Sequence, residues 1–73
     1  MKEVIDTSAL GYPECILQIA TKALHVEPGQ ILEVSCDCPT FERDVRAWCH
    51  DTGRVFLSIE HERGNKQRIQ IQL

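Results

Sequence analysis

A chain of 73 residues has room for a single thin hydrophobic core, so we expect one domain spanning residues 1–73. Its net charge of −3 argues against a nucleic-acid-binding surface, which is normally basic. No apolar run approaches the roughly 20 residues of a membrane span, and the first residues become charged too early for a signal peptide. We therefore predict a cytoplasmic protein whose four cysteines stay reduced.

The first half of the chain predicts a strand, a helix and a second strand, over residues 3–7, 13–24 and 31–36. Pro13 suits the first turn of the helix, because a proline has no N–H to leave unpaired there. Apolar residues then recur at helical spacing until Pro28 and Gly29 end the unit. In the second strand the apolar side chains alternate, which places Cys36 on the inward face.

The second half predicts a helix and two strands, over residues 39–52, 55–62 and 68–73. Pro39 is expected in the first turn of this helix, and Gly53 is a natural stop at its end. Both strands alternate apolar and polar side chains, with Leu57 and Ile59 on one face of the first strand. A tight-turn signal at residues 64–65 joins the two strands into a hairpin.

The order β-α-β-α-β-β favours an α+β two-layer sandwich, with a mixed four-stranded sheet and both helices on one face. If the first two strands are parallel, both helices begin at the same edge of the sheet, beyond the carboxyl ends of those strands. Ligands and chemistry tend to gather at this edge in open α/β sheets. We expect Cys15, Cys36 and Cys38 to lie near it.

Cys15 is the strongest candidate for chemistry, because it falls in the first turn of the first helix. Backbone N–H groups without intrahelical partners and the helix dipole both favour the thiolate there, and the thiolate is the reactive form. The alternative is that Cys15 is a small buried hydrophobe between helix and sheet. Cys38 is a second candidate, since it too lies at a helix N-terminus.

The remaining cysteines do not follow a standard zinc pattern. Cys49 lies about ten residues beyond Pro39, which is roughly 15 Å along the second helix at 1.5 Å per residue. A single zinc ion with bonds of about 2.3 Å cannot span that distance. Any metal site would have to combine Cys36 and Cys38 with Cys15, and we predict none.

Several stretches carry a family resemblance: the strand into Asp6, Leu10-Gly11, Pro28-Gly29, and Asp37-x-Pro39 with Arg43-Asp44. Through these residues the whole chain resembles the TusA-like (SirA-like) family of small sulfur-carrier proteins. The resemblance implies the same β-α-β-α-β-β two-layer fold. The family hallmark is a Cys-Pro-x-Pro motif at the start of the first helix, whose cysteine accepts sulfur as a persulfide and passes it to a partner.

This chain departs from the hallmark at two of the four positions, because after Gly11 it reads Tyr12-Pro13-Glu14-Cys15. Tyr12 stands where the acceptor cysteine is expected, and Cys15 stands in place of the second proline. A phenol cannot form a persulfide, so the acceptor role is moved to Cys15. Three residues are almost one helical turn, which keeps Cys15 on roughly the same face of the helix.

The resemblance implies a sulfurtransferase-like carrier that holds persulfide sulfur on Cys15 and relays it between protein partners. These partners would be a donor such as a cysteine desulfurase and an acceptor protein, without a bound cofactor and without direct contact to nucleic acid or membrane. Cys38 would be a second thiol, able to resolve a persulfide or to form a disulfide with Cys15. Two alternatives remain: a partner-binding or regulatory module that has lost transfer, and a thiol or metal sensor that pairs Cys15 with Cys36 or Cys38.

Overall fold

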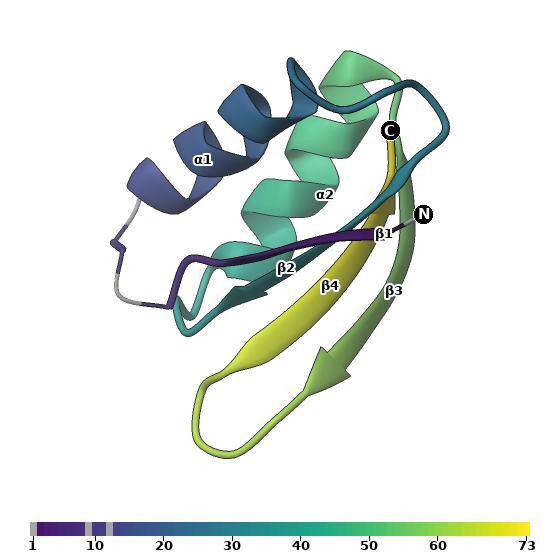
Figure 1. The fold of residues 1–73 in the computed structure, drawn as a ribbon. Helices are drawn as coiled ribbons and strands as arrows, with labels where there is room; N and C mark the ends of the chain where they lie inside the picture. The colour runs from purple at the N-terminus through teal and green to yellow at the C-terminus, as the bar shows by residue number, and fades with distance from the viewer. Residues whose placement is uncertain (1, 9, 12) are drawn as a thin grey trace.

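The computed structural model describes residues 2–8, 10–11 and 13–73, which form two layers (Figure 1). One layer is a four-stranded sheet, and the other consists of two helices that cover one face of it. The elements in chain order are β1 (Lys2–Asp6), α1 (Glu14–Ala23), β2 (Ile31–Cys36), α2 (Phe41–Thr52), β3 (Val55–His61) and β4 (Gln67–Gln72). The predicted α+β sandwich is confirmed. Neither helix is long and apolar enough to cross a membrane, and no other helix lies in the described ranges.

The strands lie in the order β1-β2-β4-β3. β1 runs parallel to β2, while β4 is antiparallel to both β2 and β3, so the sheet is mixed as predicted. Thr7 extends the parallel pairing past the end of β1, because its N–H and its Oγ1 both donate to the carbonyl oxygen of Ser35, at 2.7 and 2.8 Å. This side chain is 2% exposed and fastens the carboxyl end of β1 to that of β2.

Both helices begin beyond these carboxyl ends (Figure 1). α1 starts at Glu14, so Pro13 is the residue that caps the helix start and lies just before the first turn in which it was predicted. The prediction that Pro39 lies in the first turn of α2 is wrong, because the helix starts later, after Thr40. Pro39 is instead the second residue of a turn in which the N–H of Phe41 donates to the carbonyl of Cys38 at 3.1 Å. A proline is well suited to that turn position.

The core lies between the helices and the sheet. Its buried members are Cys15, Ile19, Leu32, Val34, Cys36, Phe41, Val45, Cys49, Ile69 and Ile71. α2 ends at Gly53, whose φ of 73° is the left-handed conformation expected at a helix stop. α1 buries only Cys15, Ile19 and Ala23, so its seal against the sheet depends heavily on one cysteine in its first turn.

The predicted alternation in β3 is wrong at its centre, because a bulge shifts the register between Phe56 and Ser58. A bulge sets two residues of one strand against a single residue of its partner. After the bulge, every side chain therefore faces the other side of the sheet than it would if the alternation had continued unbroken. Phe56 and Ile59 consequently pack against the core, while Leu57 is 42% exposed.

We expect Phe41→Ala to lower the free energy of unfolding by about 3–5 kcal/mol, because Phe41 is completely buried and alanine leaves a cavity. Leu24→Ala is the matched control, since Leu24 is 81% exposed and its loss should change stability by no more than about 0.5 kcal/mol. Urea denaturation measures both values. Equal effects of the two substitutions would contradict this description of the core.

Candidate thiol site

Three of the four cysteines meet at the sheet edge where both helices begin. Cys15 is the second residue of α1, Cys36 ends β2, and Cys38 lies in the turn that leads into α2. Cys15 and Cys36 belong to the buried core cluster, and Cys38 packs against it. The expected gathering of these cysteines is therefore confirmed. We call Cys15, Cys36 and Cys38 the thiol cluster.

Cys15 is sealed within the fold, with 0% of its surface exposed. Its N–H donates to the carbonyl oxygen of Gly11 at 3.1 Å, which closes the first turn of α1. The carbonyl of Pro13 accepts the N–H groups of Ile16 and Leu17, at 3.1 and 3.0 Å. These bonds occupy N–H groups that would be without partners at an open helix start.

The electrostatic environment of Cys15 is the opposite of the one expected from its place in the helix. Burial, followed by the neighbouring Cys36 thiol and then Cys38, raises the pKa of the Cys15 thiol from 9.0 to about 11. The backbone N–H of Ile16 lowers this pKa, as a helix start should, but its effect is the smallest. The prediction that the helix start favours the thiolate is therefore wrong for the closed fold, in which Cys15 is a protonated thiol at neutral pH.

Cys38 has a different environment. All four cysteines lie in the described part of the chain, and Cys38 is the one that is only half-buried. Its Sγ lies 3.4 Å from the Oγ1 of Thr40, which itself donates to Asp44 Oδ2 at 2.9 Å. Since the hydroxyl proton of Thr40 is used on Asp44, the Cys38 thiol is the donor to Thr40. Cys38 is thus the thiol of the cluster that another molecule can reach first.

Cys36 is hydrogen-bonded to the backbone of Cys38. Its Sγ accepts the backbone N–H of Cys38 at 3.4 Å, which holds the sulfur toward the edge of the sheet. The Cys36 side chain is itself 0% exposed. Its inward position followed from the alternation of β2, but its place beside Cys15 depends on how α1 packs and could not be read from sequence. Thr40 was missed as the partner of Cys38, and Asp44 as the partner of Thr40, although Thr and Asp four residues apart near a helix start are a recognisable signal.

The motif also singled out Gly11, Tyr12, Pro13 and Glu14. Gly11, Pro13 and Glu14 are exposed, whereas Tyr12 lies outside the described residues. Within the described ranges, no group of three or more Cys, His, Asp or Glu side chains is arranged to hold a metal ion.

Cys49 stands apart from the thiol cluster, near the far end of α2, where it is 2% exposed. Burial raises the pKa of its thiol, so it is also protonated at neutral pH. Cys49 is therefore a natural control for experiments on the cluster.

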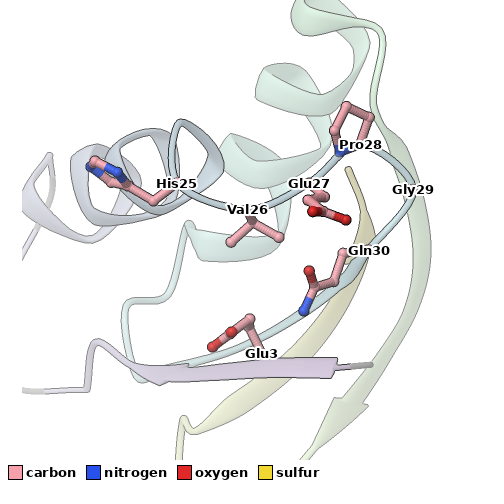
Figure 2. A pocket seen from close by; sticks show the side chains of 7 residues that line it. All are labelled: Glu3, His25, Val26, Glu27, Pro28, Gly29 and Gln30. Carbon is pink, nitrogen blue, oxygen red and sulfur yellow. The ribbon is translucent and has the colours of Figure 1, made fainter.

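A hollow of about 480 Å³ lies at the opposite edge of the sheet, near the amino ends of β1 and β2 (Figure 2). It is lined by Glu3, His25, Val26, Glu27, Pro28, Gly29 and Gln30. None of these residues is a cysteine, so the hollow and the thiol cluster are separate features.

A family model described as "Sulfurtransferase TusA" matches residues 3–73. A putative sulfur carrier protein of Aquifex aeolicus is 33% identical over 60 residues, which are 82% of this chain and 30% of that protein. The sulfur carrier proteins TusA of Pseudomonas aeruginosa and Pseudomonas putida are each 26% identical over 61 residues, or 84% of this chain. These stretches cover 77% and 76% of the Pseudomonas proteins. The chain thus spans less than a third of the Aquifex relative and about three quarters of the Pseudomonas relatives.

We expect the free energy of unfolding to fall as the pH rises from about 9 to about 11, in part because of Cys15. The folded state keeps this proton up to about pH 11, whereas the unfolded chain releases it near 9.0, so alkaline pH favours unfolding.

Urea denaturation along a pH series measures the effect. Cys15→Ala should remove part of the fall and leave the part due to Cys49, whose pKa is also raised. Cys38→Ala, at the half-buried member of the cluster, is the matched control and should keep the fall. Parallel curves for Cys15→Ala and the unsubstituted protein would contradict the burial of this thiol.

Proposed function

The chain belongs to the TusA sulfurtransferase family, and on that premise we propose that it is a sulfur carrier that holds sulfane sulfur as a persulfide on Cys15. It relays this sulfur from a donor protein, such as a cysteine desulfurase, to an acceptor protein in the cytoplasm. The observation that supports the proposal is the thiol cluster, in which a sealed thiol lies beside one that a partner can reach.

Cys38 is the entry point in this proposal. A thiolate of Cys38 attacks the outer sulfur of the donor persulfide, and the donor cysteine leaves as a thiolate. The Thr40 hydroxyl, 3.4 Å from Cys38 Sγ, fixes the direction of the thiol. Cys15 then attacks the outer sulfur of the Cys38 persulfide, the bond from that sulfur to Cys38 breaks, and Cys38 leaves as a thiol that takes up the proton of Cys15. One sulfur moves at each step, with no net oxidation.

Cys15 is suited to retaining sulfur. Its complete burial shields a persulfide from solvent and from small thiols. The release of sulfur from Cys15 requires this cysteine to leave as a thiolate, and a leaving thiol with a higher pKa leaves more slowly. Because burial raises the pKa of Cys15 to about 11, the closed fold holds the sulfur.

Release to the acceptor requires the first turn of α1 to open. α1 is attached through few buried side chains, and Gly11, Pro13 and Glu14 are exposed around its start. An acceptor that binds these exposed residues can draw Cys15 out of the core. Exposure would remove the burial that raises its pKa, and Cys15 would become a better leaving group.

A second candidate is a partner-binding module that has kept the fold and lost transfer. The observation that favours it is the complete burial of Cys15, together with a tyrosine at the position of the family's acceptor cysteine. In this case the first turn of α1 stays closed, and the exposed residues around it serve only as a docking surface.

Intact-mass measurement after incubation with a persulfide-bearing cysteine desulfurase tests the proposal. We expect the reduced protein to gain one sulfur atom, and Cys15→Ser to lose the ability to retain it. Cys38→Ser should load at least about tenfold more slowly, because the reachable thiol is gone.

Cys49→Ala is the control and should load like the unsubstituted protein, since Cys49 lies near the far end of α2, away from the sheet edge where the thiol cluster gathers. If the unsubstituted protein gains no sulfur, the carrier proposal fails and the binding module replaces it. Unchanged retention in Cys15→Ser would show that the sulfur is held elsewhere.

A further inference from the structure

Cys36 is a buried nucleophile that the proposed transfer does not use. It ends β2 on the face that carries Leu32 and Val34, and it is fully buried. Cys15, in the first turn of α1, belongs to the same buried core as Cys36. The two thiols are close enough that Cys36 contributes to the raised pKa of Cys15, ahead of Cys38. A persulfide on Cys15 would therefore form next to a second thiol inside the core.

We propose that Cys36 resolves a persulfide on Cys15, releasing hydrogen sulfide and leaving a Cys15–Cys36 disulfide. This inference rests on the proposed function, since it needs sulfane sulfur on Cys15. It adds an activity to sulfur carriage, namely the reduction of sulfane sulfur to sulfide. The substrate class is any donor that can place a persulfide on Cys15.

The step is balanced without an external oxidant. The Cys36 thiolate attacks the inner sulfur of the persulfide, which is Cys15 Sγ, and the outer sulfur leaves as hydrosulfide. The bond between the two persulfide sulfurs breaks, and the bond between Cys15 and Cys36 forms. The outer sulfur takes up two electrons, which come from the two cysteine sulfurs as they become a disulfide. The proton of Cys36 goes to the hydrosulfide.

The surroundings favour Cys36 over Cys38 as the resolving thiol. The Cys38 thiol donates to Thr40 and is half-buried, on the side of the cluster that faces solvent. Cys36 shares the buried cluster with Cys15, and its Sγ is held toward the sheet edge by the N–H of Cys38. Cys38 is thus placed to receive sulfur, and Cys36 to react with sulfur already on Cys15.

The disulfide has a structural consequence. A disulfide holds the Cα atoms of its two cysteines about 4.4–6.8 Å apart, so this bond ties the first turn of α1 to the end of β2. A first turn that is tied down cannot open to release sulfur, and a Cys15 held in the disulfide cannot accept sulfur from Cys38. Transfer and resolution therefore compete: an acceptor thiol takes the outer sulfur, and in its absence Cys36 expels that sulfur and closes the carrier.

The test monitors desalted, sulfur-loaded protein by intact mass and by a colorimetric sulfide assay. We expect up to one sulfide per chain, a final mass two hydrogens below that of the reduced protein, and a Cys15–Cys36 disulfide in the peptide map. Dithiothreitol should restore the reduced mass. Cys36→Ser and Cys36→Ala should keep the added sulfur and release no sulfide above background, while Cys49→Ala should behave like the unsubstituted protein.

The outcomes separate this inference from the proposed function. A persulfide that persists in the unsubstituted protein without sulfide release overturns the inference and leaves the carrier in place. A protein that neither gains sulfur nor releases sulfide overturns both. A disulfide between Cys15 and Cys38, or sulfide release unchanged in folded Cys36→Ser and Cys36→Ala, overturns the assignment to Cys36. Circular dichroism establishes that each variant is folded.

Discussion

The parallel pairing of β1 with β2 is the constraint on which the thiol cluster depends. Parallel strands end at the same edge of a sheet, and each of these two strands is followed by a helix that starts there. The two hydrogen bonds from Thr7 to the carbonyl of Ser35 fasten the strand ends together. Cys15 and Cys36, distant in sequence, therefore meet in one small volume. Without this pairing the chain would carry isolated thiols and no cluster.

Two physical effects oppose each other at Cys15. The backbone N–H groups at a helix start favour a thiolate, whereas burial beside two other thiols favours the protonated form, and burial prevails. α1 needs Cys15 for its contact with the sheet, so the proposed function assigns chemistry to a side chain that also serves packing. In the proposed function, the closed fold keeps the sulfur on Cys15 from an acceptor, and its release depends on local opening of one helical turn.

Much of the fold could be predicted, because helix stops, turns and alternating strands leave local signals. The stop at Gly53 and the end of β2 at Cys36 are examples. The bulge in β3 could not be predicted, since it arises from pairing with β4 rather than from local sequence. The places of Cys15, Cys36 and Cys38 in the predicted elements were enough to predict that they meet at one sheet edge. The complete burial of Cys15 could not be predicted, because it depends on how tightly α1 packs across the sheet.

The central claim is that the carrier is closed around Cys15 while Cys38 remains reachable. Limited alkylation of the folded protein near neutral pH, combined with peptide mapping, tests it most directly, because the four cysteines compete in one experiment. We expect Cys38 to be modified first and Cys15 at least about tenfold more slowly, with the difference lost in denaturant. Modification of Cys15 as fast as Cys38 in the folded protein would contradict the claim.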